Sequence, residues 1–437
     1  MNGLGDVAKR SISLRHDIRD DGGFFVVEAL RCKECGKRYP LEARFSCEEC
    51  WGPLEVAYDF SDLDAESVRR KIQAGPASIW RYADFLPFET RPRSALPTGM
   101  TPLVRAERLA ERLGIRELWV KNDAANPTHS FKDRVVSVAI PKAQELGFEV
   151  VACASTGNLA NAVAAHAAAA GLQSYVFVPA DLEEQKILAT GVYGTRLVAV
   201  RGNYDAVNRL CTQLSGERDW AFVNVNVRPY YAEGSKTVAF EVAEQLGFEA
   251  PDRVVVPIAS GSLFTKIARG FEEWREVGLL DDAVPVMNGA QAEGCSPVAQ
   301  AYEAERDVCQ PVKPDTIAKS LAIGDPADGP YAVELARRSG GGIDAVTDDE
   351  IREGIRLLAE TTGIFTETAG GVTTAVLRKL AERGDIDPDE RVVLVITGEG
   401  LKTLDAVRGS FAVHEIDATT SSFEETLGLD HAAAGAV

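Results

Sequence analysis

A single lysine among small polar residues has the clearest chemical potential in this chain. Lys132 lies in the run NPTHSFKDR, residues 126–134, just after an Asn-Pro turn and just before an apolar helical run. A lysine amine can form a Schiff base with an aldehyde cofactor when its surroundings lower its pKa. The same lysine could instead be an ordinary solvated side chain at a helix start, with Ser130 as the N-cap. The run by itself leaves both interpretations open.

A second motif combines polar side chains with the start of a helix. Ser155, Thr156 and Asn158 follow the strand-like EVVACA and open an Ala-rich segment, in the run STGNLA. Because a helix N-terminus has free backbone N–H groups, it binds anions, and these side chains add directed donors. A plain N-cap with a glycine turn would have the same sequence pattern.

Two further loops carry small residues and a terminal hydroxyl. The first loop follows the strand-like VVVPI and consists of Ala259, Ser260, Gly261, Ser262 and Leu263. Small residues let backbone amides close around a phosphate, although many strand–helix loops share this composition. Thr397 ends the strand-like VVLVI and begins TGEGLK. Its hydroxyl could meet a heteroaromatic nitrogen, or it could belong to an ordinary turn.

The elements that must position these loops alternate regularly along the chain. From about residue 99, apolar strand-like runs alternate with amphipathic or Ala-rich helix-like runs. This alternation is typical of parallel α/β architecture. The strand-like runs are short, rich in Val and Ile and apolar on both faces, as buried parallel strands are. Ligands bind beyond the carboxyl ends of strands in open α/β sheets, and the candidate loops lie at such ends.

Length and charge restrict the class of protein. With 437 residues, of which 45% are hydrophobic and 26% charged, the chain has the composition of a folded protein with two or three domains. It lacks a run of about 18 apolar residues, so we expect no membrane span. Its first residues show no export pattern. The net charge of −19 argues against DNA or RNA as a partner but not against a small anionic substrate.

Four of the eight cysteines have the spacing of a metal site, and they are Cys32, Cys35, Cys47 and Cys50. Two Cys-x-x-Cys pairs can hold a tetrahedral Zn²⁺ ion through four thiolates, and the alternative is a ribbon without metal. The other four cysteines lie singly. Because disulfide frameworks belong to short exported chains, we expect a reducing, cytoplasmic location.

Taken together, NPTHSFKDR, STGNLA, AEGSKT and TGEGLKT resemble the fold-type II enzymes that use pyridoxal 5′-phosphate (PLP), the tryptophan-synthase β-like group. MTPLV is a further stretch of the resemblance, and the cysteine module before GPLEVAYDF and the IGDPA-type segment in TIAKSLAIGDPADGP resemble the threonine synthase family more narrowly. The resemblance covers roughly residues 30 to 408.

The resemblance implies an α/β fold with two parallel-sheet lobes, the cofactor between them and an N-terminal zinc-ribbon-like module. The expected parts are the N-terminal segment with the module (1–60), a connector (61–98), a larger lobe (99–145 and 225–412), a smaller lobe (146–224) and an acidic, flexible tail (413–437). A homodimer is also expected from the family.

The resemblance also implies a role for each motif. Lys132 would carry PLP as a Schiff base and later move protons, and Phe131 would help to position it. Asn158 would hydrogen-bond the phenolic oxygen of the cofactor. The loop Ala259 to Leu263 would bind its phosphate. Thr397 would face the pyridine nitrogen, where this fold type uses a neutral hydroxyl.

The implied activity is that of a carbon–oxygen lyase, which converts O-phospho-L-homoserine and water into L-threonine and phosphate. The substrate phosphate needs cationic or donor partners. We expect them among residues close to the motifs, namely Thr101, Lys121, Ser130, Arg134, Ser155 and Thr156. For Lys121 and Arg134, the alternative is that they are solvated or form ion pairs with Asp123 and Asp133.

Several residues depart from the family pattern. His129 stands where a glycine is expected, Ala259 takes a position often held by glycine, and Glu399 adds a negative charge to the last turn. The lysine motif also continues with Val135-Val136. These departures leave open a related enzyme acting on another amino acid, of the cysteate synthase or threonine/serine dehydratase kind. A binding protein without catalysis is a third possibility, against which the intact Lys132, Asn158 and Thr397 argue.

Overall fold

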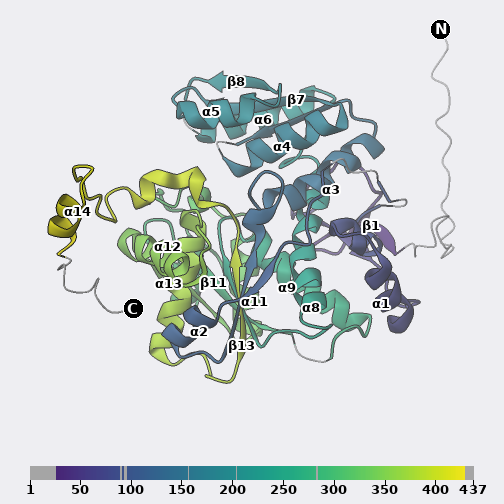
Figure 1. Cartoon of the computed structure of the whole chain (residues 1–437). Helices are drawn as coiled ribbons and strands as arrows, with labels where there is room; N and C mark the ends of the chain where they lie inside the picture. Colours follow the sequence, from purple (N-terminus) through teal and green to yellow (C-terminus); the bar gives the residue numbers. More distant parts are fainter. Residues whose placement is uncertain are drawn as a thin grey trace, which may run out of the picture.

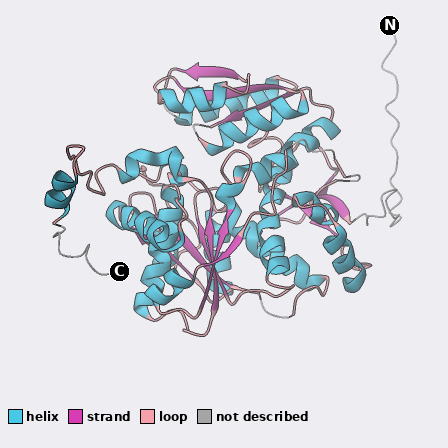
Figure 2. Cartoon of the chain, viewed as in Figure 1, coloured by secondary structure: helices cyan, strands magenta, loops and turns pink. Residues whose placement is uncertain are grey.

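The computed structural model describes residues 26–88, 91–92, 96–155, 157–202, 204–281 and 284–428. These residues form a small N-terminal sheet, a larger α/β lobe and a smaller α/β lobe, which lies above the larger lobe in the view of Figure 1. Figure 2 shows that helices flank both of the larger sheets. Within the described ranges, none of the helices has the length and apolar character needed to cross a membrane.

The N-terminal sheet is antiparallel and has the order β2-β1-β3. Its strands are β1 (Val27–Cys32), β2 (Arg38–Tyr39) and β3 (Leu54–Tyr58). The connector that follows contains α1 (Ala65–Ala74) and a short 3₁₀ segment, η1 (Ile79–Phe85). Helix α1 buries Val68 and Ile72. It begins where the Asp64 side chain accepts a hydrogen bond from the Ser67 N–H, as an N-cap does.

The sheet of the larger lobe has the order β12-β11-β10-β13-β5-β4. Its strands are β4 (Leu103–Arg105), β5 (Glu117–Asn122), β10 (Arg253–Pro257), β11 (Val286–Ala292), β12 (Gly342–Val346) and β13 (Arg391–Ile396). All neighbours pair in parallel except β4 and β5. Val254 and Val255 enter different hydrophobic cores on the two faces. Because both faces are covered, the strands read as continuous apolar runs.

Helices cover both faces of this sheet. The helices and short 3₁₀ segments outside the smaller lobe, not all of which pack on this sheet, are α2 (Glu107–Leu113), η2 (Asp123–Ala125), α3 (Lys132–Glu145), α7 (Arg228–Glu233), η3 (Gly234–Lys236), α8 (Thr237–Gln245), α9 (Ser262–Glu276), α10 (Pro297–Glu303), η4 (Lys319–Leu321), α11 (Gly329–Arg338), α12 (Asp348–Thr362), α13 (Thr368–Arg383) and η5 (Gly400–Val407). A last helix, α14 (Thr420–Leu427), is exposed along its length.

The smaller lobe has a parallel sheet of order β8-β7-β6-β9. Its elements are β6 (Val150–Ala154), α4 (Asn158–Ala170), β7 (Gln173–Pro179), α5 (Glu184–Gly191), β8 (Arg196–Val200), α6 (Tyr204–Glu217) and β9 (Ala221–Phe222). One face packs on α3 and α4, in a core that also holds residues of the N-terminal sheet. Helix α3 therefore links the lysine segment to the smaller lobe.

The strand order of the larger sheet reverses between β10 and β13. The chain steps outward from β10 to β11 and β12, and then returns to place β13 on the other side of β10. Such a reversal opens a crevice at the carboxyl ends of the two strands, where α/β proteins bind ligands. The loops containing Gly261 and Thr397 follow these two strands.

The predicted fold class, with parallel α/β sheets and a cysteine-rich N-terminal module, is confirmed. The pattern did not single out β11 and β12, because Asn288, Gln291 and Asp344 interrupt their apolar runs. Helix α14 lies in the segment expected to be a flexible tail. Residues 1–25 of the predicted N-terminal segment and 429–437 of the tail lie outside the described residues.

Candidate active site

The lysine segment is joined directly to the turn that follows β13. The Phe131 N–H donates to the Thr397 carbonyl oxygen at 2.9 Å, and Ser130 forms an isolated antiparallel bridge with Gly398. Lys132 is the first residue of α3, so its side chain leaves the helix beside this bridge. Two motifs that are some 265 residues apart in sequence thus lie side by side in the structure.

The backbone conformation of His129 explains why glycine is expected at this position and why histidine can take its place. Its φ angle is 61°, in the left-handed region that glycine adopts without strain. Histidine is one of the few other residue types enriched there. Hydrogen bonds from its own N–H to the Asn126 carbonyl oxygen, and from the Glu399 N–H to its carbonyl oxygen, hold this geometry. The imidazole itself is exposed.

The Lys132 amine lies between two aromatic rings. Nζ donates a hydrogen bond to the Tyr231 hydroxyl at 3.0 Å, and it lies 4.5 Å from the centroid of the Phe131 ring. Tyr231 comes from α7 and is 9% exposed. Nothing in the sequence motifs pointed to Tyr231. Only its position just before AEGSKT, a segment of the resemblance, could have drawn attention to it.

Asn158 is the first residue of α4, and its side-chain amide is held on both sides. Its Nδ2 donates to Glu367 Oε1 and Oε2 at 3.2 and 2.9 Å, while its Oδ1 accepts from Lys402 Nζ at 2.8 Å. Lys402 also donates to the Thr128 carbonyl oxygen at 2.6 Å. Lys402 therefore joins Asn158, the last turn and the lysine segment at one place.

Glu367 is a buried acid that the sequence motifs did not identify. It is 3% exposed and lies just before α13, with its carboxylate over Gly398. A β-carbon on Gly398 would be 2.4 Å from Glu367 Oε1, so a side chain at that position is excluded. Thr397 is also buried, and its hydroxyl lies 3.5 Å from the same oxygen. Burial raises the pKa of the Glu367 carboxyl, against the opposing effects of Asn158 and Lys402.

The small-residue loop forms a backbone cradle at the start of α9. Gly261 has a φ angle of 95°, and a β-carbon there would be 2.6 Å from the Asp328 carbonyl oxygen. The Asp328 N–H donates to the Ser260 carbonyl oxygen at 2.8 Å, and Arg228 of α7 pairs with the Asp328 carboxylate at 2.5 Å. Free amides at the N-terminus of a 15-residue helix favour a phosphate here.

The other candidate donors have mixed positions. Ser155 lies before the start of α4, where its Oγ accepts from the N–H groups of Gly157 and Ala160 at 3.3 and 3.2 Å. Ser130 Oγ is buried without a hydrogen-bond partner among the described residues, which is unusual for a hydroxyl and fits a polar ligand beside it. Thr156 lies outside the described residues.

Thr101, Lys121 and Arg134 belong to a buried ion-pair network. Arg134 contacts Asp123 at 2.6 Å and Glu241 at 2.5 Å, and Lys121 contacts Glu241 at 2.7 Å. The side chains of all four charged residues are 0% exposed. The Thr101 hydroxyl donates to Asp123 at 2.7 Å. The donor groups of these three residues are hydrogen-bonded within the protein, so they are poor candidates for binding a substrate phosphate.

This network predicts a loss of stability in acid. Burial tends to raise the pKa of Glu241, but Arg134 and Lys121 lower it to about 2. A carboxyl whose folded pKa lies below its unfolded value contributes stability that is complete above pH ~4.5 and is lost as the pH falls towards 2. We expect the free energy of unfolding, measured with urea, to fall by roughly 3 kcal/mol through this group alone. Glu241→Gln should remove that part of the pH dependence, and an unchanged profile would contradict the assignment.

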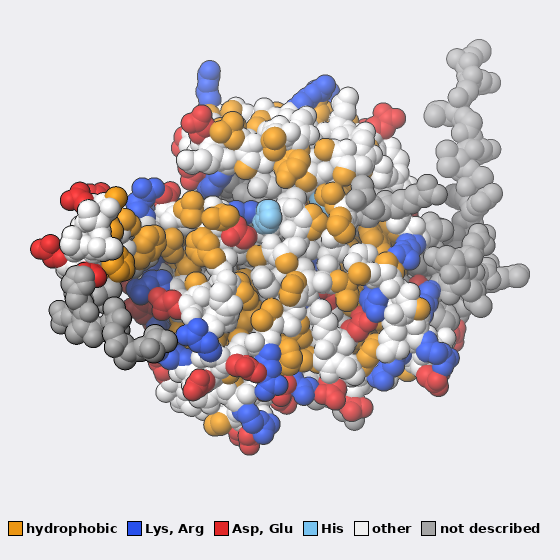
Figure 3. Space-filling model, in the orientation of Figure 1, with side chains coloured by type: hydrophobic (Ala, Val, Ile, Leu, Met, Phe, Trp, Pro, Cys, Tyr) orange, Lys and Arg blue, Asp and Glu red, His pale blue; other side chains and the backbone are white. Residues whose placement is uncertain are grey.

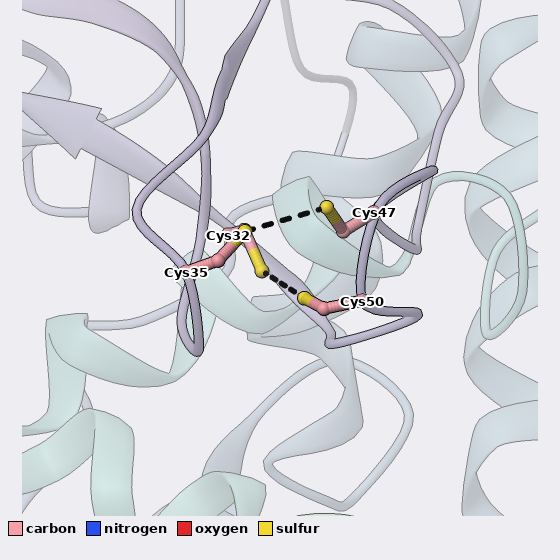
Figure 4. A group of neighbouring side chains, drawn as sticks. All are labelled: Cys32, Cys35, Cys47 and Cys50. Atoms are coloured by element: carbon pink, nitrogen blue, oxygen red, sulfur yellow. Dashed lines mark hydrogen bonds between the residues drawn. The ribbon is translucent and has the colours of Figure 1, made fainter.

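The four clustered cysteines lie close together beside the N-terminal sheet (Figure 4). Their sulfurs all lie within 4.8 Å of one another, with 3.4 Å between Cys32 and Cys50 and 3.6 Å between Cys35 and Cys47. A tetrahedral site with Zn–S bonds of 2.3 Å would place sulfurs roughly 3.8 Å apart. The donor set therefore fits Zn²⁺ in number, chemistry and spacing.

The cysteine module also contacts the candidate phosphate cradle. Lys33, next to Cys32, lies 3.7 Å from the Asp328 carboxylate and 3.3 Å from the centroid of the Tyr331 ring. The Tyr230 hydroxyl donates to the Glu42 carbonyl oxygen at 2.9 Å. The module thus contacts α7, α11 and the loop before α11, which lie next to the candidate phosphate cradle. On the face seen in Figure 3, charged side chains and a histidine gather where the two lobes meet.

Comparison with known proteins agrees with this geometry. Residues 95–398 match the family described as pyridoxal-phosphate dependent enzyme. Among solved structures, an L-serine ammonia-lyase from Rhizomucor miehei superimposes with a TM-score of 0.62, at 22% identity, covering 73% of this chain and 100% of that one. Maize serine racemase gives a TM-score of 0.60 at 20% identity, covering 77% and 94%. The two solved structures share the fold, and the family match over residues 95–398 places the chain in the class of PLP-dependent enzymes.

Curated relatives narrow the class further. Threonine synthase of Methanocaldococcus jannaschii is 40% identical over 379 residues, which cover 86% of this chain and 93% of the relative. Threonine synthases of Methanosarcina acetivorans and Halalkalibacterium halodurans are 39% and 36% identical, covering 85% and 82% of this chain and 92% and 99% of the relatives. The chain belongs to the threonine synthase family.

Proposed function

We propose that this chain converts O-phospho-L-homoserine and water into L-threonine and phosphate, with PLP as its cofactor. The observation that carries the proposal is the 40% identity to a threonine synthase along 86% of the chain. It is supported by the close approach of Lys132, Asn158 and the turn at Thr397 to one another.

The residues present fit the cofactor. Lys132 would hold it covalently, Asn158 and Thr397 would contact its ring, and the loop from Ala259 to Leu263 would bind its phosphate. When bound, PLP supplies an electron sink for negative charge at the substrate carbons. Ser130, whose buried hydroxyl has no hydrogen-bond partner within the described part of the chain, is available to the substrate or cofactor.

Lys132 also has the geometry for proton transfer. The Tyr231 hydroxyl accepts a hydrogen bond from Nζ at 3.0 Å, and the Phe131 ring lies on the amine, so both restrict its position. A positioned acid–base group contributes about 10²- to 10⁴-fold to a rate. Lys132 Nζ would take and return protons at the substrate carbons, while Tyr231 orients it.

A phosphate-release assay tests the substrate. We expect O-phospho-L-homoserine to release phosphate and yield threonine. Its kcat/KM should be at least about 10²-fold higher than that of O-phosphoserine or threonine, because those substrates lack polar contacts and leave groups of the site unpaired. Faster turnover of O-phosphoserine with sulfite would favour the cysteate-synthase-like alternative, and ammonia release from threonine the dehydratase-like one. These alternative substrates are tested because the exposed His129 replaces the glycine expected in the lysine segment.

We also propose that Cys32, Cys35, Cys47 and Cys50 bind one structural Zn²⁺ ion. Tyr39 and two backbone N–H groups offset the effect of burial and lower the pKa of Cys47 to about 6, which favours a thiolate ligand. Metal analysis should find one zinc per chain. Cys47→Ala should lose the metal and lower the melting temperature, by about 1 °C for each kcal/mol lost in a chain of this length.

The buried Cys211, outside the cluster, provides a matched control. Cys211→Ala should keep the zinc, and full zinc content in Cys47→Ala would exclude the proposed ligand set. The expected homodimer and cytoplasmic location stay predictions, which light scattering after size-exclusion chromatography and cell fractionation would check.

A further inference from the structure

The side-chain amide of Asn158 is fixed in one of its two possible orientations. An ammonium group has only donors, so Lys402 Nζ at 2.8 Å must face Oδ1 of the amide. Nδ2 then faces the Glu367 carboxylate, at 2.9 and 3.2 Å from its two oxygens. A 180° flip of the amide would place two donors together at Lys402 and two acceptors together at Glu367.

The two groups that hold the amide are themselves held. The Glu367 N–H donates to the Gly398 carbonyl oxygen at 3.1 Å, and the carboxylate lies over Gly398, where no side chain fits. Lys402 is anchored by the Thr128 carbonyl oxygen at 2.6 Å, within the lysine segment. Burial penalises charge on both groups, lowering the pKa of Lys402 and raising that of Glu367, so each benefits from a polar partner.

We propose that Glu367 and Lys402 are positioning residues, which lock the Asn158 amide so that Nδ2 keeps one N–H for the cofactor. The inference rests on the proposed function in one respect, namely that Asn158 contacts the PLP ring. Nδ2 has two hydrogens, and one N–H directed between the two Glu367 oxygens would account for both contacts, which leaves the other N–H for the cofactor. If the amide were free to flip, its oxygen would face the phenolic oxygen of the cofactor and repel it.

A double-mutant cycle on PLP affinity tests this inference. The apoenzymes of the wild type, Lys402→Met, Asn158→Ala and the double variant are titrated with PLP in the absence of substrate, and the bound cofactor is followed by its visible absorption. We expect each single variant to bind PLP about 10- to 100-fold more weakly, as for a lost hydrogen bond to a charged group. The double variant should lose no more than Asn158→Ala alone, because Lys402 acts through that side chain.

Lys379→Met is the matched control. Lys379 is also half-buried and also donates to a backbone carbonyl oxygen, that of Ala345 at 3.0 Å, but it has no contact with Asn158. Its replacement should leave PLP affinity unchanged. Lys402→Arg keeps a donor and should recover most of the affinity. Glu367→Gln keeps one acceptor and should lose less affinity than Glu367→Leu.

The outcomes separate the inference from the proposed function. Additive losses in the double variant, or unchanged affinity in Lys402→Met, would overturn the positioning role. Because no amino-acid substrate is present, a failure to turn over O-phospho-L-homoserine would refute the substrate assignment and leave the cycle intact. Circular dichroism and the melting temperature of each variant show whether a weaker affinity comes from lost folding, and Glu367→Gln provides a second arm should Lys402→Met not fold.

Discussion

Replacing Lys132 with alanine is expected to abolish covalent attachment of PLP and to lower kcat/KM by at least about 10³-fold. The amine would be lost both as the attachment point and as the acid–base group, and the acid–base role alone is worth about 10²- to 10⁴-fold. The purified wild type should be yellow, and borohydride reduction followed by peptide mapping should place a pyridoxyl group on Lys132. The variant should lack the visible band.

The control for this prediction is a lysine away from the site. Lys313 is exposed, and Lys313→Ala should keep both the colour and the rate. Because Lys132 is half-buried and donates only to the Tyr231 hydroxyl among the hydrogen bonds of the described residues, its removal should cost little folding stability. A trapped pyridoxyl group on any other lysine would falsify the assignment of the site. A colourless wild type that binds no PLP would favour a binding protein without catalysis.

Replacing Arg134 with methionine is expected to have the largest effect on stability. The guanidinium donates to Asp123 and Glu241 inside a network with no solvent exposure. Its removal leaves two buried carboxylates with only Lys121 as a cationic partner. Breaking a buried ion pair by removing one partner typically costs about 3–5 kcal/mol. We expect a loss of this size in the free energy of unfolding, measured with urea.

Arg337→Met is the matched surface control. Arg337 pairs with Asp307, whose side chain is 92% exposed, and such pairs contribute about 0–1 kcal/mol. Adding Glu241→Gln to Arg134→Met should recover part of the loss, because one uncompensated charge is removed. A normally folded Arg134→Met variant with a raised KM for the phosphorylated substrate would instead restore the role that the sequence suggested for this residue.

The sequence predicted the architecture and the position of each motif relative to strands and helices. Parallel α/β lobes follow from apolar runs that alternate with helical runs, because a strand buried on both faces must be apolar throughout. The motifs around Lys132, Asn158 and Thr397 each lie at the end of a strand or the start of a helix, as expected. Four cysteines at short spacing predicted a compact cluster, and their sulfurs do lie together.

The roles of isolated charged residues could not be predicted in the same way. From the sequence, Lys121 and Arg134 could be cations available to a substrate, solvated charges or ion-pair partners of Asp123 and Asp133, and Arg134 does pair with Asp123. Their main partner, Glu241, lies over 100 residues further along the chain. Tyr231 and Glu367 reach the site from α7 and the start of α13, and neither forms a motif with the residues it contacts.

The sequence by itself therefore determined the fold class, the catalytic lysine candidate and the loops that surround it, because these depend on local periodicity and short-range turn chemistry. The tertiary structure alone decided which polar side chains are spent on one another and which remain for a ligand. A hydrogen bond or ion pair requires atoms within about 3 Å. Parallel strands are joined by long crossovers, so the atoms that meet in this fold are often far apart in the sequence. Local sequence patterns therefore do not predict these contacts.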